Sequence, residues 1–145
     1  MGKKRTVKKA GGGFDSALKA RSLSRAIKKK VSIGTLHIQS SYNNTQLLLT
    51  DKEGNTLCWG SSGSLGFKGT KKGTPFAAAK VGELIGEKAE AIGVKEADVV
   101  IKGVGVGRES SLRAFASKGG VQIRSIRDET PVPFNGPRPK KPRRV

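Results

Sequence analysis

The chain has 145 residues, a length that suits one domain with tails, and 29 Lys and Arg against 11 Asp and Glu give it a formal net charge of +18. So large a positive charge favours a polyanion as the partner, and nucleic acid is the polyanion that we expect first. One cysteine and one histidine exclude a disulfide within the chain and leave too few ligands for a zinc site, which needs about four.

The positive charge is concentrated at the two ends of the chain. Residues 1–30 hold 11 Lys and Arg against one acidic residue, residues 31–130 hold 13 against 10, and residues 131–145 hold 5 against none. Blocks of like charge repel themselves and stay unfolded until a polyanion accepts them. We therefore predict a basic, disordered N-terminal extension, a folded core and a basic, proline-rich C-terminal tail with these boundaries.

Two alternatives remain open for the N-terminal extension. Residues 15–30 have a weak apolar stripe and could form a short basic helix when bound to a partner. The first six residues, MGKKRT, also fit the loose N-myristoylation pattern, so a lipidated membrane-surface protein is a competing hypothesis. No run approaches the ~20 apolar residues of a membrane-spanning helix, and no apolar segment follows the basic start as in a secretory signal. We expect a cytoplasmic protein, or one in an organellar stroma or matrix, with no membrane partner.

Three predicted strands open the core. Apolar and polar residues alternate over residues 35–40, which predicts a half-buried strand, and the asparagines that follow favour a turn. The stretches QLLLTD and TLCWGSS predict two more strands around the hairpin loop DKEGN, so the three strands should form an antiparallel meander. We expect His37 and Trp59 to be packed inside the protein, and Cys58 to be a buried, inert thiol.

A glycine-rich loop with three lysines and no acidic residue follows, over residues 63–74. Thr74 as N-cap and Pro75 in the first turn predict a helix, which Gly93 should end. DVVIK predicts a fourth strand and VQIRSIRD a fifth, with a second helix between them that ends at Gly119 or Gly120. Proline and positive charge argue against regular structure from residue 131 onward.

The stretch VVIKGVGVGRESSLRAF resembles the start of a nucleotide-binding phosphate loop. Its glycines, Gly103, Gly105 and Gly107, do not match the dinucleotide fingerprint, because the third comes one residue early, and no Gly-Lys-Ser/Thr sequence is present. Two interpretations stay open at this point. The loop is either a tight glycine turn between strand and helix, or a place where backbone N–H groups face a phosphate.

The element order β-β-β-α-β-α-β predicts an α/β fold with a ribonuclease-H-like, mixed five-stranded sheet and helices packed on it. A nuclease on this fold would need clustered carboxylates to hold two metal ions. The first predicted strand has none, and Asp51 and Asp128 stand at strand ends without evident partners. We therefore predict no catalytic residues, no metal site and no cofactor, and a divalent-metal cleavage assay would test the nuclease alternative.

Four stretches carry a resemblance to a known family: HIQSSYNNT, DKEGNTLCWGSSGSLGFKGTKKGTPFAA, KGVGVGRESSLRA and TPVPFNGPRPKKPRRV. They resemble, in order and spacing, the universal small-subunit ribosomal protein eleven family in its bacterial or organellar form. The resemblance covers about residues 30–145. Pro137 stands where relatives often have cysteine, and Phe134 where histidine is frequent.

The resemblance implies a structural, non-enzymatic constituent of the small ribosomal subunit. It implies that the chain binds and bridges helices of small-subunit ribosomal RNA on the platform, near the messenger RNA exit, and touches neighbouring platform proteins. We expect no homo-oligomer. A generic nucleic-acid-binding basic protein remains the alternative, because charge alone does not exclude it.

The candidate RNA-binding residues fall into four groups, in the predicted turn, the lysine loop, the glycine loop with its helix, and the tail. Phosphate and shape contacts should dominate over base stacking, because aromatic residues are sparse. Asn135 precedes Gly136, so we also consider deamidation to isoaspartate there. The predicted RNA contacts are Asn43, Asn44, Lys68, Lys71, Lys72, Gly103, Gly105, Gly107, Arg108, Arg113, Asn135, Arg138, Lys140, Lys141, Arg143 and Arg144.

Overall fold

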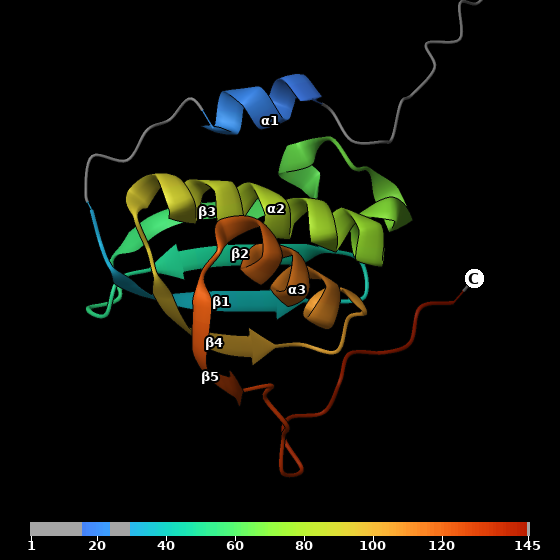
Figure 1. Cartoon of the computed structure of the whole chain (residues 1–145). Helices are drawn as coiled ribbons and strands as arrows, with labels where there is room; N and C mark the ends of the chain where they lie inside the picture. The colour runs from blue at the N-terminus through green and yellow to red at the C-terminus, as the bar shows by residue number, and fades with distance from the viewer. Residues whose placement is uncertain (1–15, 24–29, 145) are drawn as a thin grey trace, which may run out of the picture.

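A computed structural model describes residues 16–23 and 30–144 of the chain (Figure 1). It has the predicted order of strands and helices, with two short 3₁₀ helices in the lysine loop and one helix before the core. The elements are α1 (Ser16–Leu23), β1 (Ile33–Ser40), β2 (Thr45–Thr50), β3 (Thr56–Ser61), η1 (Gly63–Leu65), η2 (Gly69–Gly73), α2 (Pro75–Ile92), β4 (Glu96–Lys102), α3 (Gly107–Gly119) and β5 (Gln122–Asp128).

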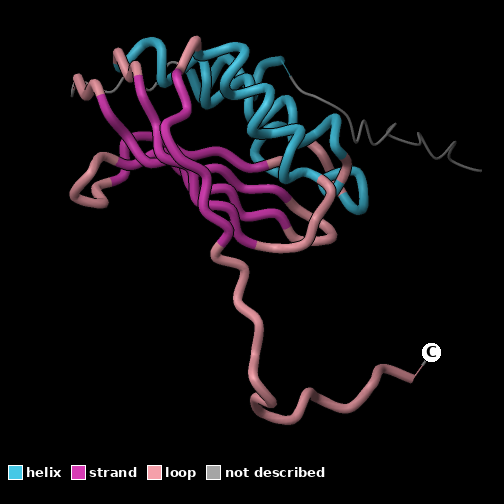
Figure 2. The backbone as a smooth tube through the Cα atoms, turned by 60° about the horizontal axis from the view of Figure 1, so that its bottom comes forward, coloured by secondary structure: helices cyan, strands magenta, loops and turns pink. Residues whose placement is uncertain are grey.

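The strands form the predicted five-stranded mixed sheet, in the order β3-β2-β1-β4-β5. The meander pairs β1 with β2 and β2 with β3 antiparallel, whereas β4 lies parallel to β1 and β5 parallel to β4. The parallel pairs require crossovers, which α2 and α3 provide. Both helices cover the same face of the sheet (Figures 1 and 2).

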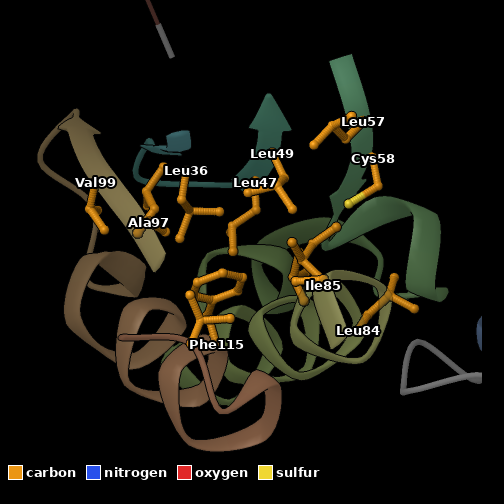
Figure 3. Packing of buried hydrophobic residues seen from close by; sticks show 14 of the residues in the cluster. Leu36, Leu47, Leu49, Leu57, Cys58, Leu84, Ile85, Ala97, Val99 and Phe115 are labelled. Carbon is orange, nitrogen blue, oxygen red and sulfur yellow. The ribbon is translucent and has the colours of Figure 1, made fainter. Parts of the chain in front are cut away.

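The core lies between that face and the two helices (Figure 3). Side chains of alternate strand residues, such as Leu36 and Ile38, point to it and are buried. Phe115 of α3 is fully buried in the same cluster. The helices approach closely at Gly82, where an added Cβ would lie 2.4 Å from the carbonyl oxygen of Ser111. The packed core therefore depends on a glycine that the apolar periodicity of the helix does not single out.

The predicted ends of α2 are confirmed. Thr74 accepts a hydrogen bond from the backbone N–H of Ala77 at 3.3 Å, and Pro75 is the first helical residue. Gly93 follows the helix with φ of 90°, the left-handed conformation that favours glycine.

Part of the N-terminal extension is helical and lies against the core. Helix α1 falls within the segment predicted to become a helix, and Lys19 Nζ lies 2.7 Å from Glu87 Oε1 of α2. Residues 1–15 and 24–29, the remainder of the extension before residue 30, lie outside the described ranges. The predicted disorder and the N-myristoylation pattern therefore stay predictions. Within residues 16–23 and 30–144, no helix has the length and apolar character needed to cross a membrane.

Among the described helices, none covers the opposite face of the sheet, and this overturns one prediction. Trp59 is not packed inside the protein, because it lies on this open face with 60% of its surface exposed. His37 lies on the same face half-buried, with its Nε2 3.4 Å from the hydroxyl of Thr50. Cys58 faces the core instead, and burial raises the pKa of its thiol to about 11, as expected for an inert cysteine.

Candidate nucleic-acid interface

Three of the four predicted RNA-binding groups meet at one end of the molecule (right side of Figure 1). We call the segments 41–44, 63–74 and 103–107 the loop end. The turn between β1 and β2 lies in the middle. A Cβ added at Gly73 would lie 2.2 Å from the carbonyl oxygen of Tyr42, and one added at Gly105 would lie 2.2 Å from that of Ser41. Segments far apart in the sequence are therefore in direct backbone contact.

The glycines of the third segment serve this contact. Gly103 has φ of 100°, and a Cβ there would lie 2.1 Å from the carbonyl oxygen of Ser40. A Cβ at Gly107 would lie 2.3 Å from Thr45 Oγ1. The missing side chains let the loop lie directly on the end of β1 and the start of β2. The structure thus gives these glycines an internal packing role, and a phosphate contact through them stays a prediction.

Arg108 has internal partners, which the sequence analysis did not foresee. Its guanidinium donates to the carbonyl oxygen of Gly103 and forms an ion pair with the carboxylate of Asp128. Thr130 joins the group by donating from Oγ1 to Asp128 Oδ1 at 2.6 Å. Arg108 therefore ties the glycine loop to the end of β5, and a phosphate would compete with Asp128 for its guanidinium.

Asp51 and Asp128 have hydrogen-bond partners that the sequence did not indicate, although no carboxylate cluster forms around either of them among the described residues. Hydrogen bonds from Thr130 and Arg108 lower the pKa of Asp128 to about 2. The carboxylate of Asp51 accepts backbone N–H bonds from Glu53 at 3.0 Å and Asn55 at 2.9 Å, so it shapes the β2–β3 hairpin. Both acids have structural roles at turns. Within the described parts of the chain, no three His, Cys, Asp or Glu residues come together as metal ligands.

The lysines of the loop end keep their charge uncompensated. Lys68 and Lys71 are exposed and Lys72 is half-exposed, on and beside η2. Among the described residues, none of the three forms an ion pair. A cluster of like charges without a carboxylate is favourable only next to an anion.

The two predicted asparagines differ in their surroundings. Asn43 is exposed at the tip of the turn. Asn44 is half-buried, and its backbone closes the turn with Ser41, whose N–H donates to the Asn44 carbonyl oxygen at 2.9 Å. The side-chain Oδ1 of Asn44 is buried and finds no hydrogen-bond partner among the residues that the structure describes. Asn43 is thus the better placed of the two for contact with a ligand, while Asn44 shapes the turn.

The start of α3 also belongs to the loop end. Val106 is its N-cap and supplies no side-chain hydrogen bond, in contrast to Thr74 of α2. The first N–H groups of this 13-residue helix therefore have no capping side chain, which leaves them suited to an anion. Glu109 in the first turn provides a local negative charge. Arg113 lies further along α3, exposed, and away from the contacts that join the three segments.

Sequence analysis missed two aromatic residues at this end. Tyr42 is 79% exposed in the turn, and Phe76, in the first turn of α2, is 60% exposed. The Phe76 ring lies edge-on to Phe67 with centroids 6.1 Å apart. Tyr42 directly precedes Asn43, and Phe76 follows Lys72 by four residues, so their closeness in sequence to predicted RNA-binding residues was the available signal. Exposed rings next to lysines are suited to stacking on unpaired bases.

The fourth group does not join the others. The tail leaves β5 and runs away from the core (Figure 2). Every residue from 131 to 144 is exposed. It holds the predicted contacts Arg138, Lys140, Lys141, Arg143 and Arg144. Asn135 adopts φ of 55°, a left-handed turn conformation that asparagine tolerates.

Comparison with known proteins adds an independent observation. The family model of ribosomal protein S11 matches residues 34–144. A small ribosomal subunit protein uS11 of Leptothrix cholodnii is 52% identical over 126 residues, which cover 87% of this chain and 93% of that protein. The protein of the same name from Thermotoga maritima is 51% identical over 119 residues, covering 81% and 91%. That of Treponema pallidum is 50% identical over 121 residues, covering 83% and 95%.

Proposed function

Because the chain belongs to the ribosomal protein S11 family and is a structural, non-enzymatic component of the small ribosomal subunit, we propose that it binds and bridges helices of small-subunit ribosomal RNA. The site of action is the platform, near the messenger RNA exit, beside neighbouring platform proteins. The protein then works in the cytoplasm, or in the stroma or matrix for an organellar ribosome.

One observation carries the RNA-binding proposal, namely the convergence of the turn, the lysine loop and the glycine loop at the loop end. Lys68, Lys71 and Lys72 supply charge for phosphates, and the start of α3 supplies N–H groups. Tyr42 and Phe76 supply rings for unpaired bases. Folded RNA with looped-out bases offers both phosphates and unpaired bases, whereas a plain duplex offers mainly phosphates.

The tail provides a second RNA contact away from the loop end, which is what bridging requires. Its five cations are spread along an extended, proline-containing segment. Such a segment follows a groove and neutralises several phosphates in turn. A core bound to one RNA helix and a tail bound to another would hold the two helices together.

Arg108 is a positioning residue in this proposal. Its bonds to Gly103 and Asp128 hold the glycine loop and β5 in one arrangement. The phosphate contact predicted for Arg108 would require Asp128 to share its guanidinium, so we assign direct contact first to the lysines.

The test compares two charge reversals of equal size. One variant carries Lys68→Glu and Lys71→Glu at the loop end, and the control carries Lys52→Glu and Lys95→Glu, two exposed lysines at the opposite end of the core. Each chain is expressed with a tag, and its co-migration with the small subunit is followed through a high-salt sucrose gradient. The loop-end variant should be lost from the subunit and the control retained.

Equal retention of both variants would contradict the proposed interface. A second arm separates the generic nucleic-acid-binding alternative, because charge-driven binding falls with salt whatever the sequence. Wild-type protein should prefer folded small-subunit RNA to random duplex at matched salt, and no preference would favour the alternative.

A further inference from the structure

The C-terminal tail begins at a cluster of hydrogen bonds that also holds the loop end. Thr130 is the last residue before the tail, and its Oγ1 accepts the backbone N–H of Gly103 at 3.2 Å and donates to Asp128 Oδ1 at 2.6 Å. Arg108 pairs with Asp128, and its guanidinium donates to Thr130 Oγ1 at 3.4 Å. The guanidinium also donates to the Gly103 carbonyl oxygen. We call these four residues the tail anchor.

The anchor joins a segment of the loop end to the start of the tail. Gly103 uses both its backbone N–H and its carbonyl oxygen in the anchor. The backbone of Thr130 is held as well, since its N–H donates to Asp128 Oδ1 at 3.0 Å. The N–H of the preceding Glu129 donates to the carbonyl oxygen of Ile101 at 2.9 Å. The point where the tail leaves the core is therefore fixed relative to the loop end.

Beyond the anchor, the described tail residues have no other bonds that would orient them. Thr130 is half-buried, whereas every residue from 131 to 144 is exposed. Within the described parts of the chain, no residue after Thr130 makes a hydrogen bond or an ion pair. Pro131 and Pro133 follow at once and restrict the backbone. The direction set at Thr130 therefore extends toward the turn at Asn135 (Figure 2).

The charges of the anchor favour an internal role over a phosphate contact. Hydrogen bonds from Thr130 and Arg108 lower the pKa of Asp128 to about 2, so the carboxylate is ionised at physiological pH and neutralises the guanidinium. Lys68 and Lys71 of the loop end have no such partner among the described residues. A phosphate is therefore attracted more strongly to these lysines, and the anchor stays closed while RNA is bound.

We propose that the tail anchor is a positioning device, which fixes the direction of the basic tail relative to the loop end. The inference rests on the proposed function, because it takes both regions as RNA contacts. A tail that starts in a fixed direction meets its RNA helix at a higher effective concentration than a freely swinging one, and loses less entropy on binding. Arg108 and Thr130 then act on RNA binding without touching RNA.

A comparison of affinities separates the anchor from the tail charges. The probe is small-subunit ribosomal RNA refolded in magnesium, and the affinity of each full-length chain is measured at one salt concentration. Thr130→Val removes the anchor hydroxyl, whereas the control Thr130→Ser keeps it. Each substitution is made in the wild-type chain and in a neutral-tail chain. In the neutral-tail chain, glutamine replaces the five tail cations Arg138, Lys140, Lys141, Arg143 and Arg144.

The expected result depends on the state of the tail. Thr130→Val should weaken binding about tenfold in the wild-type chain, as a part of the gain that linking two contacts gives. It should weaken binding no further in the neutral-tail chain, and Thr130→Ser should bind as the wild type does. An equal loss in both chains would mean that the hydroxyl only supports the loop end, and it would overturn the proposal. Unchanged affinity of Thr130→Val in the wild-type chain would also overturn it.

An insertion covers the case in which Thr130→Val disturbs the fold. A Gly-Ser-Gly-Ser segment between Thr130 and Pro131 leaves the anchor residues in place and frees only the tail. This chain should lose affinity to a similar degree as Thr130→Val. The same segment inserted after Arg144 is the matched control, because it follows all the tail cations, and it should have no effect. Wild-type affinity of the first insertion would show that the direction of the tail is irrelevant.

The proposed function and the anchor fail in different ways. Wild-type affinity of the neutral-tail chain would contradict the tail contact itself and overturn both. Weaker binding of that chain, together with full affinity of Thr130→Val, would leave the RNA contacts standing and overturn positioning alone. A measurement without RNA adds a direct test, with spin labels on cysteines introduced at Asn43 and Val132. The distance distribution should be narrow in the wild type and broad in Thr130→Val, and equal widths would overturn the proposal.

Discussion

The loop end and the open sheet face are both exposed, but they differ in how their charges are arranged. At the loop end, Lys68 and Lys71 have no ion-pair partner among the described residues. On the sheet face, Lys102 and Arg127 both approach Glu129. A positive charge without a counter-charge favours binding of an external anion, whereas a charge that already has a carboxylate partner attracts an anion less strongly. Composition alone gives one net charge and does not separate the two surfaces.

The two regions differ in backbone packing as well. The loop end is held by backbone contacts at glycines, and the sheet face by regular strand pairing.

The largest effect should come from a substitution at Gly103. Gly103→Ala puts a Cβ 2.1 Å from the Ser40 carbonyl oxygen in a residue with φ of 100°. We expect a loss of several kcal/mol in the free energy of unfolding, since steric overlap adds to backbone strain. Gly54→Ala is the matched control, because Gly54 has φ of 89° and no atom within 4 Å of an added Cβ. It should cost only about 1 kcal/mol in urea unfolding, and equal losses would show that the loop contact adds nothing.

The second effect concerns binding strength and its dependence on salt. Lys68→Glu with Lys71→Glu removes two cations at the loop end. The slope of log affinity for small-subunit RNA against log salt concentration should become shallower by about 1–2, at roughly 0.7–0.9 per lost phosphate contact. Lys52→Glu with Lys95→Glu should change the slope little. A similar change of slope in both variants would mean that RNA affinity depends on the net charge of the protein and not on the lysines of the loop end.

A smaller effect should appear at acid pH. The carboxyl of Asp128 has its pKa lowered from 3.8 to about 2 by bonds from Thr130 and Arg108. Its folded pKa lies below the unfolded value, so its contribution to stability is present above about pH 4 and is lost as pH falls toward 2. Carbon-detected NMR titration should find the low pKa in the wild type and a higher pKa in Arg108→Gln, which stays below 3.8 because the hydrogen bonds from Thr130 remain. A normal pKa in the wild type would remove the link between the glycine loop and β5.

The smallest effect is expected at Trp59 in the isolated protein. With 60% of its surface exposed, Trp59→Ala should change the free energy of unfolding by less than about 1 kcal/mol. Phe115→Ala is the contrast, because a fully buried phenylalanine typically costs about 3–5 kcal/mol. Urea unfolding measures both. A large loss at Trp59 would show that the indole stabilises the fold itself.

The residue types within short stretches of the sequence were enough to predict much of the candidate interface. The lysine loop, the asparagine turn and the glycine loop were each identified before their positions in space were known. Their meeting was not, because it depends on β1 lying between β2 and β4, a long-range pairing. Arg108 illustrates the limit, since its partner Asp128 lies 20 residues further along the chain. Trp59 was assigned to the interior because large aromatic residues are usually packed.

The strands of the core and the ends of α2 follow from local sequence, because alternation, Thr74 and Gly93 act through neighbouring residues. The sequence also determines the separation of the cationic ends from the nearly balanced core. Which sheet face the helices cover, and with it whether Trp59 is buried, depends on the packing of the whole core. Alternation tells which residues share a face, but the face that is excluded from water depends on where α2 and α3 pack.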